Sequence, residues 1–230
     1  MRVALTSVLL AGMAYGGLSY ASTDVSPAHS TAGAAASRCA LGPDTQWLVV
    51  EGSSSDNYYR VQQEEGRTVF HTDYPKDTST VTLGRRVPDS AVGWRHLAWS
   101  WRVHRFPENG NEKMSSREDS AMAVYATFGS QLHRQSLKYV WSTTLPAGTV
   151  VGPKRTLFYD IVTIVLQGPG GANRWQDEKV DVAADWARFF GDPGASPEQA
   201  PPMVGLGLLT DGDDTESTPS ADIADIALTP

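Results

Sequence analysis

Two short acidic runs contain the side chains best suited to chemistry. Glu118 and Asp119 are adjacent at the start of an apolar run, and a pair of carboxylates beside a cleft can act as acid and base on a glycosidic bond or help hold a cation. Adjacent residues on a strand point to opposite faces, so we expect only one of the two to enter any one site. The alternative is a solvated strand entrance in which Arg117 is the counter-ion.

The second acidic run is the turn at residues 211–216, which reads Asp-Gly-Asp-Asp-Thr-Glu. Closely spaced carboxylates on a loop are hard oxygen ligands of the kind that Ca²⁺ prefers. We predict that Asp211 and Asp213, together with Asp225, brace a loop or hold a structural Ca²⁺, which is the only cofactor suggested by the sequence. The spacing departs from that of an EF-hand, and an acidic turn that serves only solubility is the alternative.

Aromatic residues are concentrated on two predicted strands. Trp99, Trp101, Tyr139 and Trp141 could offer flat faces on which a sugar ring stacks, with Asp119 hydrogen-bonding to its hydroxyl groups. The alternative is a packed core, because the inward face of a sheet accepts large apolar side chains. For Trp99 and Trp101 the strict alternation favours the core.

The familiar catalytic motifs are missing. The chain has no G-x-S-x-G elbow, no phosphate-binding loop ending in Gly-Lys-Ser/Thr and no H-E-x-x-H. The histidines are scattered, and no two of them have ligand spacing on one element, so no histidine metal site is predicted. They are His29, His71, His96, His104 and His133. The sequence therefore favours a binding protein over an enzyme.

Length and charge restrict the classes of protein further. The chain has 230 residues, of which 40% are hydrophobic and 20% charged, as in a soluble globular domain. A net charge of -7 argues against nucleic acid as a partner, since phosphate binding needs clustered Lys and Arg. A single cysteine, Cys39, excludes an intrachain disulfide framework.

The N-terminal segment is predicted to lie outside the fold. Arg2 followed by an apolar stretch, with small residues at Ser19 and Ala21, predicts a signal peptide over residues 1–21 and a periplasmic or secreted protein. Gly and Ser interrupt the apolar stretch, so it is not expected to anchor the protein in a membrane. Residues 22–44 are predicted to be a flexible leader with Cys39 exposed, either as an accidental thiol or in a dimerising disulfide.

From Trp47 onward the pattern is that of short strands. Residues 97–103 alternate strictly, with Leu97, Trp99, Trp101 and Val103 on one face. Similar runs recur at regular spacing to the end of the chain. Only residues 181–190 have helical spacing, after an Asp suited to cap a helix. We therefore predict one domain over residues 45–230, an all-β, jelly-roll-like antiparallel β-sandwich with one short helix near 181–190.

The order of these elements resembles that of a known family. The segments that carry the resemblance are Tyr59-Arg60-Val61, residues 97–103, Glu118-Asp119 with residues 124–128, Tyr139-Val140-Trp141, Asp185-Trp186, and residues 210–215 before Ala224-Asp225-Ile226. Together they resemble the bacterial domain-of-unknown-function family 3047, over about residues 47–228. The resemblance implies an exported single-domain β protein without a settled activity. The family pattern tends to have two Asp where this chain has Glu118 and Asp119, and an Arg where it has Ala123.

Three hypotheses about function follow. The first is an exported protein that binds a carbohydrate or similar polar ligand through an aromatic and acidic cleft. The second is a polysaccharide-active lyase or hydrolase that uses Glu118 or Asp119. The third is a structural envelope protein with a protein partner, which would need fully buried Trp residues and an exposed apolar patch.

Overall fold

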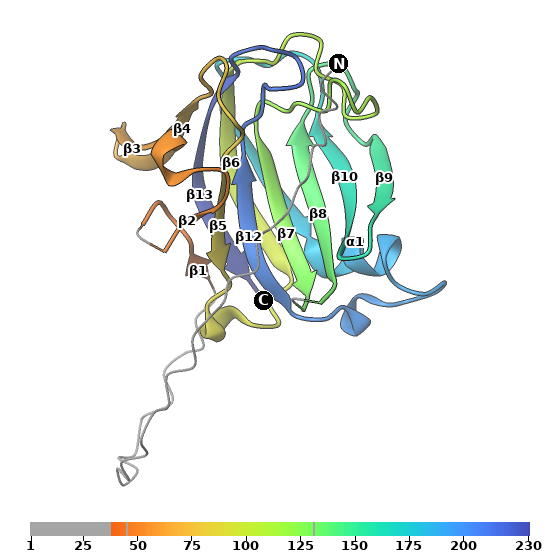
Figure 1. Ribbon diagram of the computed structural model, residues 1–230. Coiled ribbons are helices and arrows are strands. Elements are labelled where there is room, and N and C mark those ends of the chain that lie inside the picture. The colour runs from red at the N-terminus through yellow and green to blue at the C-terminus, as the bar shows by residue number, and fades with distance from the viewer. Residues whose placement is uncertain (1–37, 45, 131) are drawn as a thin grey trace, which may run out of the picture.

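Two β-sheets packed face to face form the molecule (Figure 1). The computed structural model describes residues 38–44, 46–130 and 132–230. The predicted signal peptide and most of the predicted leader fall outside these residues. Within them, no helix is long and apolar enough to cross a membrane.

Sheet A has the strand order β11-β6-β13-β4-β3, and β1 also pairs with β13. All its pairs are antiparallel. Its strands are β1 (Cys39–Ala40), β3 (Tyr59–Glu64), β4 (Arg67–Asp73), β6 (His96–Arg105), β11 (Gln176–Asp181) and β13 (Ser220–Thr229).

Sheet B has the order β2-β5-β12-β7-β8-β10-β9. Its strands are β2 (Leu48–Glu51), β5 (Thr82–Arg86), β7 (Ala123–Gly129), β8 (Arg134–Trp141), β9 (Val150–Arg155), β10 (Tyr159–Gln167) and β12 (Met203–Leu209). Three short 3-10 helices, η1 (Ser54–Asp56), η2 (Asp89–Ala91) and η3 (Pro197–Gln199), lie in connections. The predicted all-β sandwich is confirmed.

One strand pair departs from the antiparallel prediction. β8 and β10 run parallel, from Tyr159 opposite Arg134 to Val165 opposite Val140. The connection between them returns along the sheet edge as β9, so β10 starts from the same end as β8. A parallel pair requires such a crossover. The residue pattern of the individual strands does not reveal whether a pair is parallel or antiparallel.

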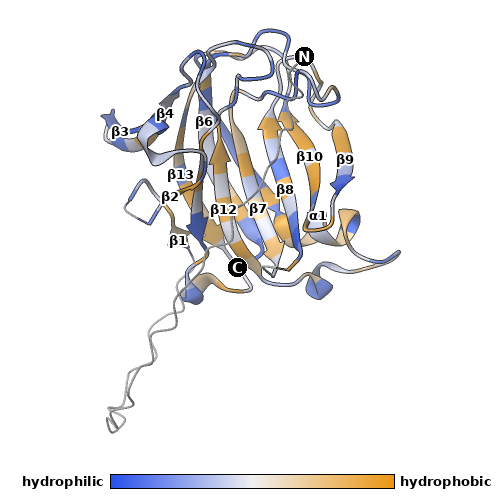
Figure 2. Ribbon diagram, viewed as in Figure 1, coloured by the Kyte–Doolittle hydropathy of each residue, from blue (hydrophilic) through white to orange (hydrophobic). Residues whose placement is uncertain are grey.

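Alternation on β6 explains how the core forms. Leu97, Trp99, Trp101 and Val103 are 0–2% exposed and face sheet B, while the intervening residues face outward. Figure 2 shows hydrophobic residues along the central strands, whereas the β3 strand at the sheet edge is mostly hydrophilic. Burying each large side chain contributes about 1.5–3 kcal/mol, so this one strand contributes much of the stability of the sandwich.

The described residues contain one α-helix, which confirms the predicted short helix. α1 (Val182–Phe189) begins after Asp181, whose side chain accepts a hydrogen bond from the Ala184 N–H. Arg95 donates to the same carboxylate, 2.6 Å from Nη2 to Oδ2, and so fixes the start of the helix. An added Cβ at Gly191 would lie 2.6 Å from the Ala187 carbonyl oxygen, which explains the glycine after the helix.

The predicted leader ends earlier than expected. Cys39–Ala40 forms strand β1 against Leu228 and Ala227, and Leu41 is 0% exposed in the core. Cys39 is half-buried rather than exposed. A two-residue strand is too short to produce a periodic pattern, so this start of the sandwich was not visible in the sequence.

Candidate functional site

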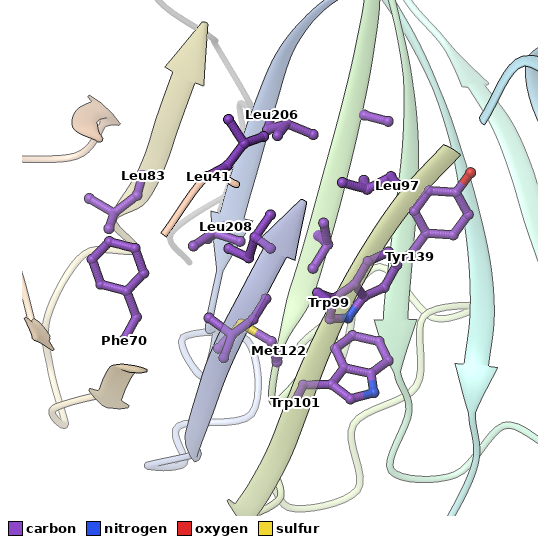
Figure 3. Packing of buried hydrophobic residues seen from close by; sticks show 14 of the residues in the cluster. Leu41, Phe70, Leu83, Leu97, Trp99, Trp101, Met122, Tyr139, Leu206 and Leu208 are labelled. Atoms are coloured by element: carbon purple, nitrogen blue, oxygen red, sulfur yellow. The ribbon is translucent and has the colours of Figure 1, made fainter. Parts of the chain in front are cut away.

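The predicted aromatic platform lies inside the sandwich. Trp99, Trp101, Tyr139 and Trp141 are 0–2% exposed, because the inward faces of β6 and β8 oppose each other. Trp99 packs edge-on against Trp101 with 5.3 Å between ring centroids, and Figure 3 shows Trp99 between Trp101 and Tyr139. The stacking surface predicted for these four residues is therefore wrong, and the core alternative holds.

The polar atoms of Tyr139 and Trp101 are also engaged, whereas the buried Trp99 Nε1 has no hydrogen-bond partner. The Tyr139 hydroxyl donates to Asp185 Oδ2 at 2.8 Å, and Trp101 Nε1 donates to Glu178 Oε1 at 3.1 Å. Burial raises the pKa of Asp185 and of Glu178. These contacts join α1 and β11 to the core and leave no polar atom of Tyr139 or Trp101 facing solvent.

The predicted acidic pair does not form one site. Glu118 Oε2 lies 3.3 Å from Lys154 Nζ, so its ion-pair partner is Lys154 rather than Arg117. Asp119 is 0% exposed, and its Oδ2 accepts from both the backbone N–H (2.7 Å) and the hydroxyl (2.5 Å) of Thr215. Asp119 therefore holds the 211–217 loop in place and does not reach a ligand's hydroxyl groups.

Three carboxylates come together beside this loop. Asp119, Asp211 and Asp213, here called the carboxylate cluster, each place an oxygen within 4.8 Å of the other two. Burial and the charges of Asp213 and Asp119 raise the pKa of Asp211 well above its ordinary value. Burial and the charges of Asp119 and Asp213 raise the pKa of Asp214 to about 6. Oxygen ligands in this number suit Ca²⁺, which stays a prediction.

Asp225 is not part of the carboxylate cluster. It lies on β13 in sheet A, where its Oδ2 is 3.1 Å from Arg67 Nε. Its φ of 54° marks a bulge at which the pairing of β13 with β6 shifts register. The predicted metal set of Asp211, Asp213 and Asp225 is therefore corrected, with Asp119 in the place of Asp225.

A second cluster, which the sequence did not predict, lies on the outer face of sheet A. Strand register places His71 of β4 opposite Asp222 of β13, and Asp222 opposite Arg102 of β6. His104 follows two residues after Arg102 and so shares its face. His71, His104 and Asp222 are here called the His–Asp cluster.

Both oxygens of Asp222 are used within this group. His71 Nδ1 lies 2.7 Å from Oδ1, and His104 Nε2 lies 2.7 Å from Oδ2. Arg102 donates to Oδ2 through Nε at 3.0 Å and through Nη2. The Asp222 side chain is 3% exposed. Burial alone would raise the pKa of Asp222, but the hydrogen bonds from Arg102, His71 and His104 outweigh it and lower the pKa.

Both imidazoles also have a second partner. His71 Nε2 lies 3.1 Å from Asp73 Oδ2, and His104 Nδ1 lies 3.0 Å from Asn173 Oδ1. Burial opposes the charged form of His71, but the bonds to Asp222 and Asp73 raise its pKa above the ordinary value. The only sequence signal for this cluster was that Arg102 and His104 share one face of an alternating strand. This signal gives no indication that β13 lies between β4 and β6.

A polar cavity of about 590 Å³ adjoins the His–Asp cluster. It lies where β3 and β4 meet the segment that precedes β3 and the segment that follows β4, and His71 belongs to both features. Its lining residues are Ser55, Asp56, Asn57, Tyr58, Arg60, Gln62, His71, Asp73, Pro75 and Thr78.

One aromatic ring lies on the same outer face. The Trp175 ring centroid is 4.6 Å from Arg67 Cζ and 4.7 Å from Arg102 Cζ, and both guanidinium groups make cation–π contacts with the ring. Arg102 thus links the Trp175 ring to the His–Asp cluster. Trp175 was not singled out from the sequence because it precedes β11 rather than alternating within it.

The fold and these sites define a two-sheet β-sandwich with polar clusters at a loop end and on one outer face. The chain belongs to the family described as "Protein of unknown function (DUF3047)", whose model matches residues 45–227. No functionally curated protein is a significant match.

Several solved structures match this chain with TM-scores below 0.5. The xyloglucanase domain of NopAA, a type three effector from Sinorhizobium fredii solved with cellobiose, has a TM-score of 0.43 and 11% identity, covering 86% of this chain and 99% of that one. Endoglucanase 3 of Trichoderma harzianum, from family GH12, has a TM-score of 0.42 and 10% identity, covering 86% and 96%. A family 11 carbohydrate-binding module from Clostridium thermocellum, solved with a mixed-linked tetrasaccharide, has a TM-score of 0.39 and 10% identity, covering 84% and 95%. TM-scores and sequence identities this low do not indicate the function of this chain, which has to be inferred from the site itself.

Proposed function

We propose that this protein binds a carbohydrate or a similar polar ligand in the cavity beside the β3–β4 hairpin. The observation that carries the proposal is the composition of that cavity, which combines hydrogen-bond donors with acceptors in about 590 Å³. Each hydroxyl of a sugar both donates and accepts, so a lining of mixed polar character matches it. The signal peptide predicted over residues 1–21 supports a site that operates in the periplasm or outside the cell.

The hairpin register explains why the polar groups converge. Arg60 on β3 lies opposite His71 on β4, and Gln62 and Asp73 follow on the same outward face. Arg60 Nη1 also donates to the Asn57 carbonyl oxygen at 2.8 Å, which ties the preceding loop to the strand. The cavity lining therefore combines Asp56 and Asp73 with Arg60 and His71, so it carries charges of both signs.

Gln62→Ala tests this proposal, with Gln63→Ala as the matched control. The two residues are adjacent on β3 and point to opposite faces; Gln63 lies outside the cavity and donates to Thr68 Oγ1 at 2.7 Å. Losing one or two hydrogen bonds to the ligand should weaken binding about three- to tenfold. Calorimetry against cell-wall and exopolysaccharide fragments should show this for Gln62→Ala only.

Two results would count against the proposal. One is a wild-type protein that binds none of these fragments at millimolar concentration. The other is an equal loss of affinity in both variants, because the cavity would then not be the binding site.

A structural role with a protein partner is the second candidate, and one observation favours it. Leu132, Leu157 and Phe158 are 84%, 79% and 63% exposed, and a hydrogen bond from the Arg134 N–H to the Phe158 carbonyl oxygen joins their loops. Exposed apolar groups of this kind often mark contacts with other proteins. Replacing Leu157 with Asp should abolish any concentration-dependent association seen by sedimentation, and a wild-type protein that stays monomeric would remove a second copy of this chain as the partner.

A further inference from the structure

We infer that His71, His104 and Asp222 form a binding site for a divalent transition-metal ion such as Zn²⁺. The inference concerns a site next to the proposed ligand cavity and does not depend on the identity of any ligand there.

The donor set is the first argument. Two imidazole nitrogens and one carboxylate are ligands that Zn²⁺ takes up, and three protein ligands with an open position are typical of accessible zinc sites. In the described residues these three donor atoms all lie within 4.8 Å of one another. They come from three adjacent strands, β4, β13 and β6, so the sheet itself holds them in place.

The existing hydrogen bonds provide the second argument. His71 and His104 both direct a ring nitrogen to the Asp222 carboxylate at 2.7 Å. A metal ion bound among the three residues would replace the hydrogens that now link them.

The second partners of the imidazoles provide the third argument. A metal-binding histidine usually donates its other ring N–H to a carboxylate or carbonyl oxygen, which fixes the ring orientation. Asp73 Oδ2 is placed to do this for His71 and Asn173 Oδ1 for His104. Arg102 holds Asp222 Oδ2 and also bonds Glu64 Oε2, leaving Oδ1 for the ion.

Charge and access are compatible with an ion. Asp222, Asp73 and Glu64 bring three negative charges, and Arg102 and Arg105, their ion-pair partners, bring two positive charges, so neutral imidazoles would leave one net negative charge in this group. The side chains of His71 and His104 are 22% and 29% exposed. His71 also lines the cavity, which gives the ion a path from solvent.

Zinc calorimetry on the full chain, in a Cys39→Ser background that removes the thiol, tests the inference. We expect one equivalent of Zn²⁺ to bind, and binding to weaken by at least about tenfold in His104→Ala and in His71→Ala. His133→Ala and His96→Ala are matched controls, because these histidines also lie beside a carboxylate, at 3.3 Å from Asp160 and 3.9 Å from Asp181. Both controls should bind zinc like the parent protein.

A second measurement distinguishes the loss of the zinc site from misfolding of a variant. Zinc should raise the thermal midpoint of the parent protein and leave that of His104→Ala unchanged. No zinc uptake by the parent protein, or equal uptake by His104→Ala and the controls, would overturn the inference. His104 does not line the cavity, so its result is independent of the proposed polar ligand.

Discussion

Tyr139→Phe removes one buried hydroxyl that joins helix α1 to sheet B. The Tyr139 side chain is fully buried, and its hydroxyl donates to Asp185 Oδ2 at 2.8 Å. A hydrogen bond to a charged group contributes about 1.5–3 kcal/mol, so we expect the free energy of unfolding at pH 7 to fall by about 2 kcal/mol. For a domain of this size that corresponds to a midpoint lower by about 4–8 °C.

The size of this loss should depend on pH through Asp185. Burial raises the folded-state pKa of Asp185, so the favourable contribution of this group is present below its unfolded pKa and is lost as pH rises through the folded value. Removing the Tyr139 hydroxyl raises that pKa further, because the hydrogen bond stabilises the charged carboxylate. The cost of Tyr139→Phe should therefore grow as pH rises through the raised folded-state pKa of Asp185.

Urea denaturation followed by tryptophan fluorescence measures this cost in a double-mutant cycle. In an Asp185→Ala background, Tyr139→Phe should cost less than about 0.5 kcal/mol, since the acceptor is gone. The same loss in both backgrounds would refute the reasoning, and so would a loss that does not change with pH. Carbohydrate binding should be unaffected by Tyr139→Phe, in contrast to the aromatic platform that the sequence predicted.

Three further predictions concern the core, the helix and the carboxylate cluster. Trp101→Ala should lower the free energy of unfolding by about 3–5 kcal/mol in urea denaturation, because it leaves a large cavity between the sheets; a loss below about 1 kcal/mol would contradict this packing. Asp181→Ala should cost about 1–2 kcal/mol in thermal melts, since the Ala184 N–H and Arg95 lose their acceptor; no change would argue against the cap. If the carboxylate cluster holds calcium as predicted, millimolar Ca²⁺ at tenfold over Kd should stabilise the protein by about 1.4 kcal/mol, and Asp213→Asn should remove this effect; an unchanged midpoint would refute the calcium site.

Features set by neighbouring residues could be predicted from the sequence. The alternation of residues 97–103 predicted β6, and Asp181 before an apolar pattern predicted the start of α1. In each case the physical cause lies within a few positions along the chain.

Features set by pairing of distant segments could not be predicted. Alternation favours burial of Trp99 and Trp101, but it does not reveal that Tyr139 and Trp141 of β8 are the residues that cover them. Asp119 joined the carboxylate cluster instead of Asp225 because the 211–217 loop folds back onto the start of β7. His71 and His104 lie close together because β13 pairs between β4 and β6, two strands that are far from it in the chain.

The position of β13 has a consequence for how the protein is made. This strand pairs with β6 on one side and β4 on the other, and it also pairs with β1. The earlier strands of sheet A therefore cannot complete their pairing until residues 220–229 have been synthesised. Until then their apolar faces are incompletely covered. Because long-range pairing of this kind is slow, the nascent chain has to be kept from aggregating during that interval.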